Sequence, residues 1–258
     1  MNNSNTLSEQ GRVSLSAEDP FRLDERLLLA ASLYEPCALG ADVGTDHGLL
    51  PRHLLAEGVC KRMIVADISE KALRHARETI RLSGLEDRAE IVCADGLHAV
   101  TRPCGCVSIM GMGGETMAEI LRRGQGRLHG AALVLSAHTE QHLVREVLRD
   151  IGYRITAERL CLAEGRYYIF WKAVPGQEDV TDSDLRYGRL LFEHNPEHLP
   201  GYLAWRIKYL TGKLKGLRSA SAPDAALIAQ IEQDLAFYQA RQEECSHADR
   251  QAGVRHHP

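Results

Sequence analysis

The feature that most constrains the fold of this chain is a series of five short apolar runs. A turn with a glycine or an acidic residue follows each run, and most of these turns lead into a stretch whose apolar residues have helical spacing. The runs cover residues 38–43, 63–66, 90–93, 107–110 and 133–136. Helices are predicted at about 49–57, 70–83, 115–123 and 140–151, and Asp24 could cap an earlier helix at 25–34. Ser69 is a predicted N-cap, and Gly84 and Gly152 stand where glycines end helices. This alternation predicts an α/β fold in which a parallel sheet carries helices on both faces.

The pattern changes after Gly152. Two strand-like runs, 153–162 and 166–174, are joined by Ala163-Glu164-Gly165. A pair of this kind predicts a β-hairpin that adds an antiparallel strand to the edge of the sheet.

The second half of the chain predicts a helical hairpin. A polar stretch at 175–179 marks a boundary, and apolar residues then recur at the 4-3-4-3 spacing of a coiled coil, at Leu203, Ile207, Leu210, Leu214 and Leu217. The spacing resumes after Pro223, so two antiparallel arms are expected. The predicted organisation is a flexible N-terminal tail (1–20), a sheet domain (21–176), a helical hairpin (177–246) and a flexible tail (247–258).

Composition limits the class of protein. The chain has 258 residues, is 44% hydrophobic and 26% charged, and has a formal net charge of −4, which is typical of a globular protein. No apolar run is long enough to span a bilayer and the N-terminus is polar, so we expect a cytoplasmic protein without a membrane partner. Seven unevenly spaced cysteines fit a reducing compartment, and Cys104 and Cys106 lack the partners of a zinc site, so no metal is expected.

The first strand ends in the most informative motif, Asp42-Val43-Gly44-Thr45-Asp46-His47-Gly48. A strand that turns through glycines into a helix is a nucleotide-binding corner. The corner lacks the three glycines of a dinucleotide fingerprint, which disfavours a nicotinamide oxidoreductase. It has the form of an S-adenosylmethionine loop in which Asp46 replaces the middle glycine.

Four consecutive strand ends carry acidic residues or glycines. In open α/β sheets such ends form the ligand crevice. Any one of these residues could simply form an ordinary turn. Together they predict a cofactor site made of Asp42, Gly44, Asp67, Ile68, Asp95, Gly96, Gly111, Met112 and Gly113.

At this point the chain resembles a known family. Asp42 to Pro51, Asp95-Gly96-Leu97 and Gly111-Met112-Gly113-Gly114, in this order, are similar to the TrmK-type tRNA adenine-N1 methyltransferases of bacteria. The resemblance covers about residues 21–240. It implies a class I methyltransferase fold with a C-terminal helical hairpin, S-adenosylmethionine as cofactor, and transfer of a methyl group to N1 of adenine 22 in the D-arm region of tRNA. One departure is that Ser136-Ala137-His138 stands where a Gln-Pro pair is expected.

The chemistry of this reaction suggests catalytic residues. N1 of adenine already has a lone pair, so alignment and compensation of the developing positive charge are the main demands. Asp46 is the candidate carboxylate, and the alternative roles are a cap of the following helix or a hydrogen bond within the loop. His47 could move a proton or contact phosphate, or could be structural.

The target base must be unpaired or flipped out of its stack, because N1 lies on the Watson–Crick edge. The Gly111–Gly114 turn makes room for a base and offers no aromatic stacking surface. This fits methylation of a ring nitrogen better than methylation of an amino group.

A basic stretch predicts where RNA binds. Residues 185–218 contain seven basic residues and two acidic ones. Arg206, Lys208, Lys213 and Lys215 could follow phosphates on the first arm of the hairpin, and Arg122 and Arg123 form a second candidate patch. The alternative is an ordinary solvated helix face.

Two further functions stay open: a methyltransferase for a small molecule or protein, and a non-catalytic RNA-binding module. The basic arm disfavours the first, and the complete set of strand-end acids disfavours the second. The sequence leaves the oligomeric state open, with a monomer favoured.

Overall fold

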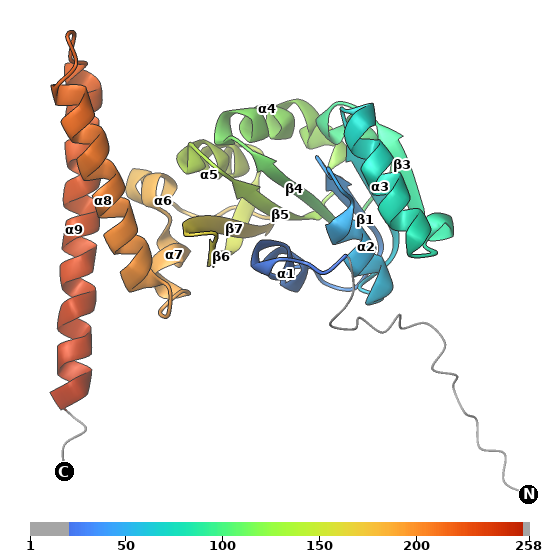
Figure 1. Ribbon diagram of the computed structural model, residues 1–258, viewed down its shortest axis with the longest axis horizontal. Helices are drawn as coiled ribbons and strands as arrows, with labels where there is room; N and C mark the ends of the chain where they lie inside the picture. The colour runs from blue at the N-terminus through green and yellow to red at the C-terminus, as the bar shows by residue number, and fades with distance from the viewer. Residues whose placement is uncertain (1–20, 255–258) are drawn as a thin grey trace, which may run out of the picture. The chain divides into compact units, whose positions relative to one another are not determined.

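The structure, a computed structural model, describes residues 21–254, with side chains described through 247. Figure 1 shows a twisted central sheet with helices on both sides and a long helical hairpin near the C-terminus. The tail predicted at residues 1–20 lies outside the described part of the chain, as do residues 255–258 of the second tail.

The sheet has seven strands in the order β3-β2-β1-β4-β5-β7-β6. The strands are β1 (Cys37–Val43), β2 (Cys60–Asp67), β3 (Ala89–Cys93), β4 (Cys106–Met112), β5 (Ala132–Ala137), β6 (Tyr153–Ala163) and β7 (Arg166–Pro175). The first five are mutually parallel, and β7 runs antiparallel to both β5 and β6. The prediction of a parallel sheet with an antiparallel hairpin at its edge is confirmed.

The helices of the sheet region are α1 (Glu25–Ser32), α2 (Leu49–Ala56), α3 (Glu70–Leu82), α4 (Gly114–Gly124), α5 (Gln141–Asp150), α6 (Asp182–Tyr187) and α7 (Arg189–Glu193). Side chains of α1, α2 and α3 share one apolar core with β1, β2 and β7. Helices α4 and α5 pack together and lie on the other side of the sheet (Figure 1).

Local chemistry explains where these helices begin and end. The side chain of Asp24 accepts a hydrogen bond from the amide of Leu27 and caps α1, and Ser69 caps α3 in the same way. Gly84 and Gly152 follow α3 and α5 with φ of +65° and +77°, which is the left-handed conformation typical of helix C-termini. These four sequence predictions are confirmed.

The topology places a ligand crevice between β1 and β4. The chain proceeds from β1 outward to β2 and β3, and then returns to place β4 on the other side of β1. Connections on the two sides of this switch point diverge, so the carboxyl ends of β1 and β4 leave a crevice between them. Both strands end in residues selected from the sequence.

The described residues form two compact units, which divide between His194 and Asn195. The sequence prediction placed the boundary near residue 176, whereas α6 and α7 belong to the first unit. They do so because Arg145 of α5 donates hydrogen bonds to the carbonyls of Leu185 and Arg186, and Glu158 of β6 accepts one from the amide of Leu191.

The second unit is a hairpin of α8 (Leu199–Arg218) and α9 (Ala225–Val254). The predicted seam is confirmed, because Leu203, Leu210 and Leu214 are buried and face α9. Tyr202 meets Tyr238 at one end, and Arg218 pairs with Glu232 near the connecting loop. Helix α9 continues to Val254, past the predicted end at 246, because no glycine or proline interrupts residues 225–252.

No helix within residues 21–254 is both long and apolar enough to cross a membrane. In the same part of the chain, no group of three or more histidine, cysteine or acidic side chains could hold a metal ion. Cys104 and Cys106 are buried around the start of β4 as free thiols.

Candidate active site

The loop after β1 is held in a tight, left-handed path. The amides of Gly44 and Thr45 both donate to the carbonyl oxygen of Ala66, at 2.8 and 3.0 Å. Gly44 has φ of +81°, which favours glycine, and a β-carbon there would lie 3.3 Å from the Met112 side chain. The loop therefore brings its own backbone close to the Gly111–Gly114 turn.

Asp46 lies at the tip of this loop. Its φ of +49° is unusual for a residue other than glycine and is best tolerated by Asp and Asn. Its carboxylate is 71% exposed and lies 3.5 Å from the Nε2 atom of His47. Helix α2 begins at Leu49 with Gly48 as its N-cap and without a side-chain cap, so Asp46 does not fill the alternative role of helix cap.

His47 is also exposed, and its ring lies 5.0 Å from the ring of His75 on α3. The two residues selected as catalytic candidates are therefore neighbours at the mouth of the crevice, and both reach solvent. A carboxylate and an imidazole in this arrangement can hold a positive charge and pass a proton to water.

Asp42 lies at the base of the crevice. It is buried, and its Oδ1 accepts a hydrogen bond of 2.5 Å from the hydroxyl of Ser108, which in turn accepts one of 2.6 Å from Tyr34. Burial raises the pKa of Asp42, and the hydrogen bond from Ser108 opposes this shift. The register pairs Asp42 with Ser108, so this network joins β1 to β4 at the switch point.

The ends of β2 and β3 carry a different kind of surface. Asp67 accepts a hydrogen bond of 2.8 Å from the amide of Ser69, and the next side chain, Ile68, is 71% exposed. Asp95 pairs with Arg123 of α4 at 2.9 Å, and Gly96 follows with φ of +53°. The ends of these two strands therefore carry two carboxylates and an exposed apolar side chain.

The Gly111–Gly114 turn ends β4 with a shift of register between Met110 and Met112. Gly111 has φ of +79°, and a β-carbon built there meets nothing within 4 Å. Gly114 is required by packing, since its β-carbon would lie 2.3 Å from the carbonyl oxygen of Glu140. The turn thus leaves open space at Gly111 while it is locked to the loop after β5.

These features enclose a cleft of 280 Å³ on the β4 side of the switch point. Among the residues selected from the sequence, Asp42, Gly44, Asp46, His47 and Gly111 line it. Asp67, Ile68, Asp95, Gly96, Met112 and Gly113 do not, so the expected site divides into two parts.

Other residues that line the cleft were not among the predicted site residues, and they include Arg26, His138, Tyr168 and Phe170. They come from α1, the end of β5 and β7, which are distant in sequence, and no motif connects them. The only signal was the departure at Ser136-Ala137-His138, which marked this wall as unusual.

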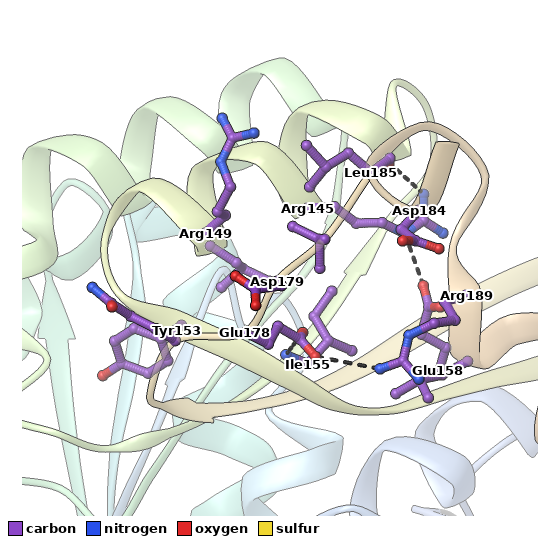
Figure 2. Close-up of a pocket in the computed structure, with 14 residues that line it drawn as sticks. Arg145, Arg149, Tyr153, Ile155, Glu158, Glu178, Asp179, Asp184, Leu185 and Arg189 are labelled. Carbon is purple, nitrogen blue, oxygen red and sulfur yellow. Dashed lines mark hydrogen bonds and ion pairs between the residues drawn. The ribbon is translucent and has the colours of Figure 1, made fainter. Parts of the chain in front are cut away.

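A second cleft, of 210 Å³, lies beside α5 and β6 (Figure 2). Its base is the buried ion pair between Arg145 and Glu158, at 2.8 Å, and Glu158 also accepts a hydrogen bond from Trp171. Nearer the opening, Glu178 accepts from the amide of Ile155 and pairs with Arg189. Because these groups bind one another, this cleft serves to attach α6 and α7 to the sheet.

The basic residues proposed to contact RNA differ in their surroundings. Arg122 is exposed, whereas Arg123 pairs with Asp95 and Glu119. In the hairpin, Lys208, Lys213 and Lys215 are exposed. Arg206 is half-buried: its guanidinium lies 5.6 Å from the ring centre of Tyr209 and 5.5 Å from that of Tyr238, and its Nε atom is buried, because the long side chain packs over aromatic rings.

The strand ends fit an adenosyl cofactor. The carboxylates of Asp67 and Asp95 are hydrogen-bond acceptors suited to ribose hydroxyls and an adenine amino group, and the exposed side chain of Ile68 offers an apolar contact. Gly44 and Gly111 let a bulky ligand approach the backbone between this surface and the cleft.

Comparisons with known proteins agree with this geometry. A family model described as a methyltransferase domain matches residues 23–170. The tRNA (adenine(22)-N(1))-methyltransferase of Bacillus subtilis (strain 168) is 28% identical over 162 residues, which cover 62% of this chain and 68% of that protein.

Two solved structures cover 86% of this chain. A protein of the NADB-Rossmann superfamily from Streptococcus agalactiae is 25% identical, with a TM-score of 0.77 over 97% of its length. A Streptococcus pneumoniae protein, provisionally assigned as a tRNA (m1A22) methyltransferase and solved with S-adenosyl-L-methionine, is 26% identical, with a TM-score of 0.74 over its whole length.

The predicted fold class and the similarity to TrmK-type enzymes are thereby confirmed. The family model spans more than half of the chain and covers every strand end that forms the crevice. The chain belongs to the methyltransferase-domain family.

Proposed function

We propose that this protein transfers a methyl group from S-adenosylmethionine to N1 of adenine 22 in the D-arm region of tRNA. The observation that carries the proposal is the charge of the cleft beside the switch point. Three carboxylates line it (Asp24, Asp42 and Asp46) against one guanidinium (Arg26). Methylation at N1 makes the adenine ring cationic, and an excess of negative charge stabilises that change.

The same charge argues against some other acceptors. A phosphate or carboxylate would have to enter a cleft whose base, Asp42, is itself a buried carboxyl group. A neutral, planar base that becomes positive during the reaction suits these surroundings better.

The cofactor would lie across the ends of β1, β2 and β3, held by Asp67, Ile68 and Asp95, with its reactive end toward Asp42. When bound, S-adenosylmethionine supplies an electrophilic methyl group on a sulfonium sulfur. Gly44 and Gly111 are then required because side chains there would occupy the passage between the two parts of the site.

The protein has few chemical tasks in this reaction. The N1 lone pair needs no base, so the main requirement is to hold the ring in line with the methyl group. The exposed carboxylate of Asp46 would compensate the positive charge of the ring and could accept a proton from the exocyclic nitrogen. His47, 3.5 Å away, would pass that proton to solvent.

We propose that the two units divide the work, with the first (to His194) performing the chemistry and the second (from Asn195) binding RNA. Lys208 and Lys215 are seven residues apart on α8 and therefore share one face, where they can contact phosphates. Action on tRNA would place the protein in the cytoplasm.

The test is to incubate the protein with S-adenosylmethionine and unmodified tRNA transcripts, and to identify the methylated nucleosides by mass spectrometry. We expect 1-methyladenosine that disappears when adenine 22 is replaced by guanine. If no nucleoside is methylated although calorimetry detects cofactor binding, the acceptor is a small molecule or a protein. If the cofactor does not bind, the protein is not a methyltransferase.

A further inference from the structure

A row of three side chains forms one wall of the cleft. The guanidinium of Arg26, fixed by Asp24 at 2.6 Å, lies 5.1 Å from the ring centre of Tyr168. The rings of Tyr168 and His138 are 5.8 Å apart and meet edge to face, at 71°. Each side chain is held by the one before it, and the last, His138, is exposed.

The backbone fixes His138 opposite the open turn. Its amide donates a hydrogen bond of 2.9 Å to the carbonyl of Met112. Gly111, on the same turn, leaves free space where other residues would place a side chain. A flat ring can therefore enter between the turn and the imidazole without displacing any side chain at Gly111.

We propose that His138 is the surface against which the target adenine lies during methyl transfer, and that Tyr168 and Arg26 are positioning residues behind it. This inference rests on the proposed function and gives a role to a residue that the sequence marked only as part of a departure from the family pattern. It also explains how a site whose glycine turn lacks an aromatic surface can hold a base: the surface comes from the end of β5 instead.

Charge supports this role. Partial desolvation, together with the cations Arg26 and Arg166, lowers the pKa of His138, which favours the neutral imidazole. A neutral ring stacks on a base and does not repel it when the base becomes cationic, whereas an imidazolium would. The groups that face His138 are Arg26 from α1 and Arg166 and Tyr168 from β7, while Asp24, Asp46 and His47 belong to the same cleft.

The first test measures the base directly. A tRNA with 2-aminopurine at position 22 reports stacking through loss of fluorescence. We expect quenching with the wild-type protein and with His138→Phe, which keeps a ring, and little quenching with His138→Ala. His129→Ala, which removes an imidazole outside the cleft, is the matched control and should quench as the wild type does.

The second test measures turnover. His138→Ala should lower kcat/KM for tRNA about tenfold, within the range that loss of one stacked base produces, while the dissociation constant for S-adenosylmethionine stays the same. In the wild type, kcat/KM should fall as the pH drops through the pKa of His138, and this fall should be smaller in His138→Phe.

The outcomes separate this inference from the proposed function. If the wild type methylates adenine 22, but His138→Ala has the same kcat/KM and quenches equally, His138 does not hold the base. If the wild type methylates no tRNA and does not quench 2-aminopurine, both the proposed function and this inference fail.

A second observation, at the opposite edge of the sheet, is independent of the methyltransferase site. Cys37 and Cys60 are the first residues of β1 and β2, they are partners in the register, and their sulfur atoms are 3.4 Å apart. Cys60 is buried and Cys37 is half-buried. Neighbouring strands are about 4.8 Å apart, which lies within the range of Cα separations that a disulfide spans.

We infer that this thiol pair is a site of oxidation by peroxides. The Cys37 thiolate attacks hydrogen peroxide, so an S–O bond forms, the O–O bond breaks and hydroxide leaves, taking a proton from solvent. The Cys60 sulfur then displaces the sulfenic hydroxyl: the S–S bond forms, the S–O bond breaks, and the thiol proton leaves with it as water. Two thiols are oxidised and one peroxide is reduced to two waters.

The reactive partner is Cys37, because its hydrogen bond with the Cys60 thiol lowers its pKa to about 7. The other exposed thiol of the sheet, Cys93, has a raised pKa because of desolvation and the neighbouring Glu70. Exposure alone therefore does not select the reactive site.

Peptide mapping without reducing agent, after treatment with equimolar hydrogen peroxide, tests this inference. We expect a disulfide between Cys37 and Cys60, a sulfenic acid on Cys37 that dimedone traps in Cys60→Ser, and unchanged disulfide formation in the control Cys93→Ser. Preferential oxidation of Cys93, or an unmodified Cys37, would overturn it. Neither result depends on methylation.

Discussion

The two halves of the crevice are built in different ways. On the side of β2 and β3, each contributing residue lies at the end of a strand within a short motif, such as Asp67-Ile68 or Asp95-Gly96. On the side of β4, β5 and β7, the cleft also takes Arg26 from α1 and Tyr168 from β7, which are 142 positions apart in the chain. A cofactor shared by many enzymes can be held by a repeated backbone pattern, whereas an acceptor requires a surface assembled for it.

This comparison predicts that substitutions in the two halves have separable effects. Those on the acceptor side should lower turnover with little change in cofactor binding. Those on the cofactor side should weaken cofactor binding and leave turnover at saturation nearly intact.

Asp46→Asn should have the largest effect. The substitution keeps the size of the side chain and its tolerance of a positive φ, and removes the charge. If Asp46 compensates the cationic ring, kcat should fall about a hundredfold, within the range of general acid–base and electrostatic contributions. Steady-state methylation assays measure kcat, and calorimetry should give an unchanged dissociation constant for S-adenosylmethionine. Unaltered turnover would remove Asp46 from the mechanism.

Asp67→Ala tests the other half. The loss of a charged acceptor for ribose hydroxyls should weaken S-adenosylmethionine binding about twentyfold, which corresponds to about 1.8 kcal/mol. At saturating cofactor, kcat should remain within about threefold of the wild type. The control is Asp87→Ala, an exposed carboxylate at the start of β3 and outside the site. If kcat falls and binding does not, the halves are not separable.

Asp42→Asn tests the boundary between the halves. Burial raises the pKa of Asp42, so this residue favours the folded state at low pH, and that contribution is lost as the pH rises through its folded pKa. The neutral amide should therefore raise the Tm at pH 7, by about 3 °C for each kcal/mol gained, while S-adenosylmethionine binding weakens about tenfold.

Two measurements check this prediction. Thermal unfolding at pH 4 and pH 7 should show that the gain in Tm from Asp42→Asn is larger at pH 7. Calorimetry should show the loss of affinity. A variant that is less stable at pH 7 would mean that the hydrogen bond from Ser108 outweighs the cost of the buried charge.

The sequence predicted those parts of the fold that the periodicity of apolar residues and the turn-forming residues determine. Five strand positions, the edge hairpin, the caps at Asp24 and Ser69, and the coiled-coil seam all follow from local patterns, and all are confirmed. The wall formed by Arg26, Tyr168 and His138 could not be predicted in this way, because it depends on which faces of α1 and β7 meet at the end of β5. The pairing of Arg123 with Asp95 and the packing of Arg206 over Tyr209 and Tyr238 were missed for the same reason: the chemistry of a charged side chain does not reveal its neighbours.

The smallest effect is expected in the hairpin, which belongs to neither half of the crevice. Lys208→Gln with Lys215→Gln removes two exposed charges from one face of α8. The KM for tRNA should rise about threefold at low salt, and the slope of log KM against log salt should decrease by about two, since each phosphate contact contributes nearly one unit. Lys61→Gln with Arg62→Gln, which removes two exposed charges from β2, is the matched control and should leave both values unchanged. Because kcat and the affinity for S-adenosylmethionine depend on the first unit, both should be the same in the two double variants. A decrease in either would show that α8 contributes to the chemistry as well as to RNA binding.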